Sequence, residues 1–134
     1  MVAVNLKLSE SGGSGTPGVT EEQIAELVET FYACVREDDL IGPIFDRYVR
    51  DWDLHLAKMK RFWSSAVLRT GTYSGRPMEA HRKIEGLERR HFDRWHSIFA
   101  RVTGDVVPDS AGVFRDLGRR MGDSMILRLL SDEV

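Results

Sequence analysis

Several features that mark large classes of protein are absent from this sequence. A single cysteine, Cys34, excludes an intramolecular disulfide and any multi-cysteine zinc or iron–sulfur site. No apolar run reaches the roughly 18 residues of a membrane span, and the N-terminus lacks the basic start and apolar stretch of a secretory signal. With 19 Lys and Arg against 21 Asp and Glu, there is no basic excess for nucleic acid. These absences predict a cytoplasmic protein that engages neither membranes nor nucleic acids.

The length and the distribution of apolar residues indicate one helical domain. The chain has 134 residues, which is typical of a single domain, and 42% of them are hydrophobic. Residues 1–19 are rich in Gly and Ser and predict a flexible N-terminal tail, which leaves 20–134 for the folded domain. No segment alternates apolar and polar residues like a half-buried strand, and no internal repeat is evident. The predicted fold class is therefore all-α.

Apolar residues recur at the spacing of amphipathic helices, and caps and breaks divide the helical segments. Thr20 and Gln23 fit a capping box at the start of the first helix, and Gly42-Pro43 breaks the chain after it. Gly71 ends the second helix, and Pro77 begins a short one. The predicted helices cover four long segments and one short segment: 20–38, 52–70, 77–84, 87–103 and 108–130.

Two of the four histidines lie on the apolar faces of predicted helices. His55 shares a helical face with Met59, Phe62 and Trp63, where an apolar side chain would be cheaper to bury. His81 lies on the inward face of the short helix. Each is explained either as a half-buried structural imidazole or as a group that faces a ligand, and for His81 this ligand would be a metal.

The other two histidines, His91 and His96, point away from each other and are predicted to lie at the surface or rim of the domain. The Glu88-x-x-His91 pair matches half of a di-iron bundle site. Because no second pair of this kind exists in the chain, a di-iron centre is not expected.

Aromatic residues gather on the inward helix faces and at helix junctions: Phe31, Tyr32, Phe45, Phe62, Trp63, Phe92, Trp95 and Phe99. An ordinary aromatic core would explain this clustering. However, the Tyr32 hydroxyl and the Trp95 indole N–H each need a hydrogen-bonding partner when buried, as does His55. Three polar groups aimed at a dry helical core fit better around a bound molecule that presents polar atoms.

Five short motifs resemble the bacterial truncated haemoglobins of group III. They are Phe31-Tyr32, Gly42-Pro43-Ile44-Phe45, His55 with Met59 and Phe62-Trp63, Tyr73-Ser74-Gly75-Arg76-Pro77 up to His81, and Phe92-x-x-Trp95. The most specific are the Gly-x-Pro four residues before His81 and the spacing of 13 between Tyr32 and Phe45. The resemblance covers about residues 20–130. The glycine pairs common in other truncated haemoglobins are missing, as they generally are in group III.

The resemblance implies a globin-like, two-over-two helical sandwich that binds one haem b per chain. His81 then matches the proximal ligand of the iron. Tyr32 matches the distal tyrosine that hydrogen-bonds a bound diatomic molecule, His55 the distal histidine and Trp95 the distal tryptophan. The remaining haem contacts that the resemblance implies are apolar side chains and a propionate partner: Phe45, Met59, Phe62, Trp63, Phe92 and Lys58, the last together with one of Arg76, Arg82 or Lys83.

The leading functional hypothesis is a haem protein that binds or transports O2, or binds NO or CO, at ferrous iron in a polar distal pocket. Hydrogen bonds from Tyr32 and Trp95 would slow ligand release. The alternative is a peroxidase-like or NO-detoxifying enzyme that needs an external reductase. A third hypothesis is a helical interaction module without a cofactor. The chain is expected to be a monomer or a weak homodimer.

Overall fold

The computed structural model describes residues 18–130. The regular elements follow the chain in this order: α1 (Glu21–Glu37), α2 (Gly42–Tyr48), α3 (Trp52–Trp63), the π-helical turn η1 (Ser64–Leu68), α4 (Pro77–Arg82), α5 (Arg89–Val106), the 3-10 turn η2 (Pro108–Ser110) and α6 (Ala111–Leu130). No strand occurs among the described residues, so the predicted all-α class is confirmed. None of these helices is long and apolar enough to cross a membrane.

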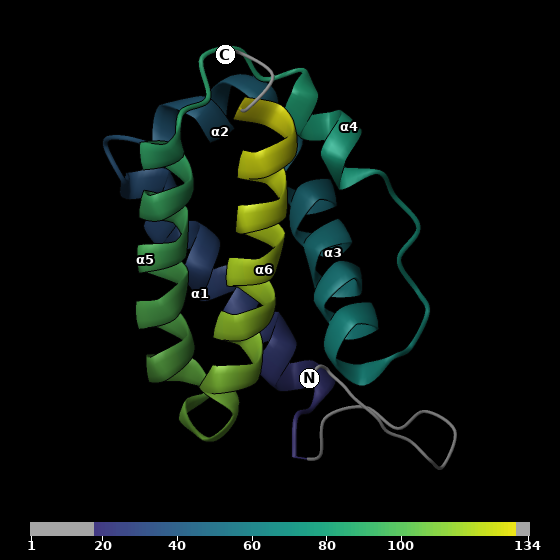
Figure 1. The fold of residues 1–134 in the computed structure, drawn as a ribbon. Helices are drawn as coiled ribbons and strands as arrows, with labels where there is room; N and C mark the ends of the chain where they lie inside the picture. The colour runs from purple at the N-terminus through teal and green to yellow at the C-terminus, as the bar shows by residue number, and fades with distance from the viewer. Residues whose placement is uncertain (1–17, 131–134) are drawn as a thin grey trace.

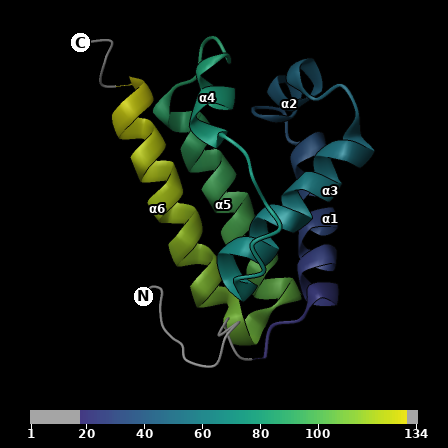
Figure 2. The same ribbon diagram turned by 90° about the vertical axis from the view of Figure 1, so that its right-hand side faces the viewer.

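The helices form two groups that meet along α1 and α5. Figure 1 shows α5 and α6 side by side, and α1 packs against both α5 and α3. Figure 2 shows α1, α2 and α3 on one side of the molecule and α6 on the other, with α4 near one end between them. The helix α4 has no buried residue and is joined to α3 by the irregular segment 69–76. Its position therefore depends little on the main core.

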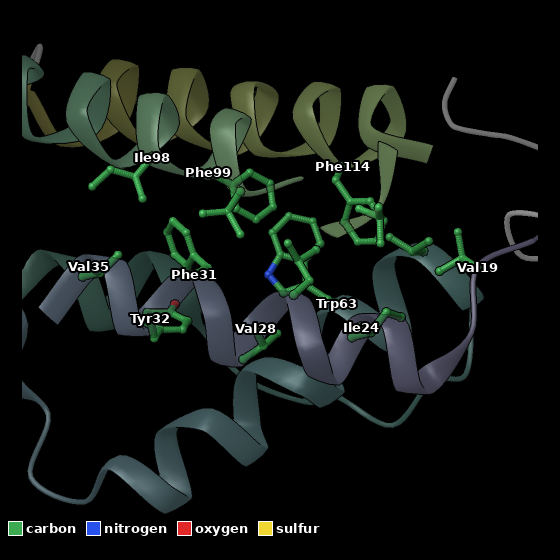
Figure 3. Packing of buried hydrophobic residues seen from close by; sticks show 14 of the residues in the cluster. Val19, Ile24, Val28, Phe31, Tyr32, Val35, Trp63, Ile98, Phe99 and Phe114 are labelled. Carbon is green, nitrogen blue, oxygen red and sulfur yellow. The ribbon is translucent and has the colours of Figure 1, made fainter. Parts of the chain in front are cut away.

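The core is an aromatic stack surrounded by aliphatic side chains (Figure 3). Phe99 stacks on Trp63 and Trp95 with ring centroids 5.0 and 4.8 Å apart, and Phe31 meets it edge-on at 5.2 Å. Helix α6 approaches closely at Gly118, where a Cβ atom would lie 3.2 Å from the Phe99 ring. Each fully buried ring of this kind contributes about 1.5–3 kcal/mol of transfer free energy. The stack therefore fixes how α1, α3, α5 and α6 pack.

Asp38 holds the corner between α1 and α2. Its carboxylate accepts hydrogen bonds from the backbone N–H groups of Leu40 and Ile41 at 3.0 and 2.9 Å, and Arg94 of α5 donates another at 2.6 Å. Burial on its own would raise the pKa of Asp38, but the bonds from Ile41, Arg94 and Leu40 outweigh it, so the pKa lies below its usual value. Asp38 thus ties this corner to α5.

Several local predictions about the helix ends are confirmed. The Thr20 hydroxyl accepts from the Gln23 N–H at 3.1 Å, and the Gln23 side chain accepts from the Thr20 N–H at 2.9 Å, which completes the capping box. The short helix begins at Pro77 as predicted. Gly42 does more than break the chain, because it opens α2 where a Cβ atom would lie only 2.9 Å from the Val35 carbonyl oxygen.

Several predicted boundaries differ from the structure: α5 runs over Arg89–Val106 rather than 87–103, α6 begins at Ala111 rather than 108, and α2 was not predicted. The second helix is α-helical only to Trp63, continues as η1, and ends at Arg69 with a φ of 63° rather than at Gly71. Residues 1–17 of the predicted tail lie outside the described residues. Val19, which was included in that tail, is 8% exposed and packs in the core, because its side chain reaches the end of the stack near Phe114 (Figure 3).

Replacing Asp38 with Asn is expected to lower the free energy of unfolding by about 1–3 kcal/mol at neutral pH, because a charged acceptor of three hydrogen bonds is lost. The folded-state pKa is depressed, so this stabilisation is present above the unfolded value of 3.8 and is lost as the pH falls through the folded-state pKa. Urea unfolding from neutral to acidic pH should show the two proteins converging. Asp39→Asn, whose side chain is 99% exposed, is the control, and equal losses in both variants would contradict the assignment.

Candidate functional site

The site begins with His81, whose orientation is set within its own helix. Pro77 starts α4, and its carbonyl oxygen lies 2.6 Å from Nδ1 of His81 one turn later. A carbonyl oxygen can only accept, so Nδ1 carries the proton and donates it. In the neutral form of the imidazole the Nε2 atom then has a free lone pair, and no hydrogen bond to it is present within residues 18–130. This is the tautomer that a metal-ligating histidine needs, with its second nitrogen fixed by a backbone carbonyl.

His55 on α3 has no partner for its inner nitrogen. Its Nε2 atom is buried and makes no hydrogen bond with the described residues. Burial, followed by the charges of Lys58 and His81, lowers the pKa of the imidazole below its usual value, so the ring is neutral at pH 7. Because His81 is among the groups that affect His55, the two inward histidines belong to one region of the fold. A buried polar atom without a partner indicates a site for a ligand.

Three rings surround His55. Tyr32 of α1 meets it edge-on with centroids 5.0 Å apart, Trp52 does so at 5.5 Å, and Phe45 of α2 lies at 6.3 Å. We call Tyr32, Phe45, Trp52 and His55 the ring cluster. Burial raises the pKa of Tyr32 far above its usual value, so its phenol stays protonated and can donate a hydrogen bond. The ring cluster thus combines apolar walls with one donor and one neutral imidazole.

The other predicted site residues occupy three different surroundings. Met59 and Phe62 are partly buried on α3, where Phe62 packs edge-on against Tyr73 at 5.1 Å. Lys58 is exposed, and Phe92 is half-buried on α5. Phe62 thus lies beside segment 69–76, and the charge of Lys58 is close enough to affect His55.

The two predicted tryptophans belong to the aromatic stack. Trp63 is 3% exposed and packs between Phe99 and Phe114, so it is part of the main core. Trp95 is half-buried and stacks on Phe99, and it reaches the ring cluster only through Phe31, which contacts it at 5.1 Å and Tyr32 at 4.8 Å. The structure brings Tyr32, Phe45 and His55 together, whereas Trp95 lies one ring further away.

One prediction about the remaining histidines is wrong. His91 was expected at the surface or rim, but it is 9% exposed, and its Nδ1 atom accepts from the Glu88 N–H at 2.9 Å. It lies in the first turn of α5 and caps that helix reciprocally with Glu88, which draws the ring inward. His96 is half-exposed, with Nε2 3.3 Å from the Arg115 carbonyl oxygen and Nδ1 3.3 Å from Arg119.

Sequence reasoning missed Trp52. It opens α3 three residues before His55, so the two lie on one helical face. That spacing could have indicated a contact with His55 from the sequence. However, Trp52 precedes the apolar pattern by which the helix was predicted. Its contacts with Tyr32 at 6.0 Å and Phe45 at 6.4 Å depend on how α1, α2 and α3 meet.

These features fit a haem. His81 offers one imidazole nitrogen with a free lone pair, and His55 has a buried polar atom without a partner. Tyr32 supplies a protonated donor beside His55, and apolar rings form the walls. This donor set matches a globin, which uses one proximal histidine and controls ligand binding through the polarity of the other side.

Comparison with known proteins assigns the chain to a family of globins. No family model matches the chain. The chain is 34% identical over 85 residues to the group 3 truncated hemoglobin ctb of Campylobacter jejuni, across 60% of this chain and 67% of that protein. The crystal structure of a group III truncated hemoglobin from Campylobacter jejuni matches with a TM-score of 0.78 and 27% identity, covering 86% of this chain and 94% of that one. The chain belongs to the group III truncated haemoglobins.

Replacing His55 with Leu is expected to stabilise the haem-free chain by about 1 kcal/mol at pH 8, because a buried polar atom without a partner is removed. The gain should grow towards pH 5. The pKa of His55 is depressed in the folded state, so the wild type loses stability as the pH falls below the unfolded value of 6.5.

Urea unfolding at the two pH values measures both effects. The control is His96→Leu, which removes contacts with Arg115 and Arg119 and should bring no gain. A His55→Leu protein that is less stable than the wild type at both pH values would contradict the interpretation.

Proposed function

We propose that the chain binds one haem b and, through it, O2 or another diatomic gas. The observation that carries this proposal is the hydrogen bond between His81 Nδ1 and the Pro77 carbonyl, which prepares Nε2 as an iron ligand. A bound haem supplies a ferrous iron that binds a diatomic molecule reversibly. Membership of the group III truncated haemoglobins supports the same assignment.

The chain's own residues would hold the cofactor in two ways. Phe45, Met59, Phe62 and Phe92 offer apolar side chains near the histidines, and each is partly exposed and so able to contact a ligand. Lys58 lies one turn after His55 with its ammonium in solvent, where it would pair with a propionate, assisted by one of Arg76, Arg82 or Lys83. Trp63 supports the wall from within the core.

Tyr32 would determine how long a diatomic ligand stays. Its phenol is protonated and has no hydrogen bond to another described residue, so the O–H is available to a ligand with partial negative charge. O2 carries more such charge than CO, which is why we place O2 first. The Trp95 N–H is a second donor in the proposal, although the ring lies behind Phe31 relative to Tyr32.

His55 favours an enzyme as the second candidate. Its imidazole is neutral and its Nε2 atom has no partner among residues 18–130, so it could accept a proton from peroxide during reduction to water. Such a reaction, or the detoxification of NO, consumes electrons, and an external reductase would have to supply them. Reversible O2 binding has no such requirement.

The assignment of His81 predicts that His81→Gly abolishes stoichiometric haem binding, because the ligating nitrogen is removed. Titration with haem, followed by the Soret band, should show one equivalent bound by the wild type and none bound tightly by the variant. Added imidazole should restore the band, which separates loss of the ligand from misfolding. His96→Gly serves as the control and should bind haem normally. Unchanged stoichiometric binding by His81→Gly would refute the assignment.

The role of Tyr32 predicts faster O2 release from Tyr32→Phe. One hydrogen bond to a charged acceptor is worth about 1.5–3 kcal/mol, so the dissociation rate should rise roughly 10–150-fold. Stopped-flow measurement of O2 dissociation from the ferrous protein tests this. Tyr48→Phe is the matched control, since the Tyr48 hydroxyl faces the Glu85 N–H at 3.3 Å, outside the ring cluster. A change of less than twofold in Tyr32→Phe would show that this phenol does not contact the ligand.

A further inference from the structure

We propose that Trp52, held in place by Arg36, is a positioning residue that keeps the His55 imidazole turned into the ring cluster. The juxtaposition that carries this inference is a cation–π contact between Arg36 and the Trp52 ring, which also packs nearly perpendicular to the His55 ring. The proposal deepens the haem-site assignment and rests on it for the effect on ligands. The position of the imidazole itself can be measured without haem.

Trp52 contacts every other member of the ring cluster. Its ring lies 5.5 Å from that of His55 at an interplanar angle of 82°, 6.0 Å from Tyr32 and 6.4 Å from Phe45. It lies three residues before His55 on α3 and so stands on the same face of the helix. Trp52 thus packs against the imidazole from the start of α3.

The His55 ring has a physical reason to leave its position. Its Nε2 atom is buried without a hydrogen-bonding partner, whereas rotation about the side-chain bonds would bring this atom into water. The charges of Lys58 and His81 lie close enough to affect the ring, and neither makes a hydrogen bond to it. The observed position therefore depends on the packing of neighbouring rings, of which Trp52 is the one on its own helix.

Arg36 fixes Trp52 from the opposite helix. The guanidinium carbon lies 4.4 Å from the centroid of the Trp52 ring, which is the geometry of a cation–π interaction. Arg36 comes from the last turn of α1, so this contact joins α1 to the start of α3. Within the described residues, Arg36 makes no ion pair or hydrogen bond that would orient it elsewhere. Trp52 is thereby in contact both with the Arg36 guanidinium and with the other three rings of the cluster.

This arrangement sets the access of a ligand to the polar side of the site. With Trp52 and Arg36 in place, the imidazole stays beside the Tyr32 phenol. When either is removed, the imidazole is expected to spend more time in solvent, which opens the site and removes a polar group from it. Trp52 and Arg36 would act only through His55, without touching a ligand.

The first measurement is the carbethoxylation of His55 by diethyl pyrocarbonate in the full chain as purified, followed by mass spectrometry. The reagent attacks an accessible, unprotonated imidazole nitrogen, so the rate reports how exposed the His55 ring is as a whole. In Arg36→Gln the rate should rise about fivefold, which corresponds to a cation–π contact of about 1 kcal/mol. Trp52→Ala should raise it further, and Arg36→Lys, which keeps a cation, should react nearly as slowly as the wild type.

Arg50→Gln is the matched control. It removes the same charge two residues before Trp52, and Arg50 is exposed and makes no contact with the ring. The second measurement is the C–O stretching band of the CO complex of each protein, which reports the polarity around the ligand. Arg36→Gln and Trp52→Ala should shift this band towards that of a less polar pocket, whereas Arg36→Lys and Arg50→Gln should not.

The outcomes separate the two proposals. If the variants carbethoxylate as predicted but the wild-type chain takes up no haem, the positioning role stands and the haem assignment fails. If the wild type binds haem while Arg36→Gln and Trp52→Ala leave both the His55 rate and the CO band unchanged, the positioning role is overturned. Should Trp52→Ala fail to fold, the comparison of Arg36→Gln with Arg36→Lys and Arg50→Gln decides the question by itself.

Discussion

The packing of Phe99 is the constraint on which the rest of the structure depends. The ring is 1% exposed and meets α1 through Phe31, α3 through Trp63 and α6 at Gly118, while Trp95 stacks on it from within α5. One side chain thus sets the spacing of four helices. Truncating a buried ring of this kind to Ala removes about 3–5 kcal/mol, which is a large share of the stability of a small domain. The geometry of every other group near the stack follows from this packing.

How much the sequence could predict depends on whether a contact is local. The capping box at Thr20, the short helix at Pro77 and the inward face of His55 follow from spacing within one helix, and the structure has them. The contacts of Trp52 require the crossing of α1 and α3, and such a crossing leaves no periodic signal. The burial of His91 was missed for a different reason, because an N-terminal capping histidine has the same spacing as an exposed one. Periodicity predicted the helices and their buried faces, whereas the roles of individual site residues came from the resemblance to a family.

The two histidines of the site are supported in different ways. His81 stands on a six-residue helix without a buried residue, and its ring is oriented by the Pro77 carbonyl. The segment before that helix is attached to η1 by the Tyr73 N–H, which donates to the Ser65 hydroxyl at 2.8 Å. His55, by contrast, lies on a helix that packs directly against α1. The side that carries the proposed iron ligand therefore depends on segment 69–76, whereas the side that carries His55 is packed against α1.

The polar groups of the ring cluster reduce the stability of the fold. Tyr32 lies against Phe31, and His55 lies against Tyr32. A Phe or Leu at these two positions would pack there without leaving a buried nitrogen such as the His55 Nε2 without a partner. Polar residues at buried positions, where an apolar residue would pack better, are expected where a protein binds a ligand, because the ligand supplies the missing hydrogen-bonding partner. The aromatic stack behind Phe31 offsets part of this loss of stability. Its rigid side chains hold the polar groups in place at little further entropic cost. The same packing that stabilises the domain therefore also prepares its ligand-binding side.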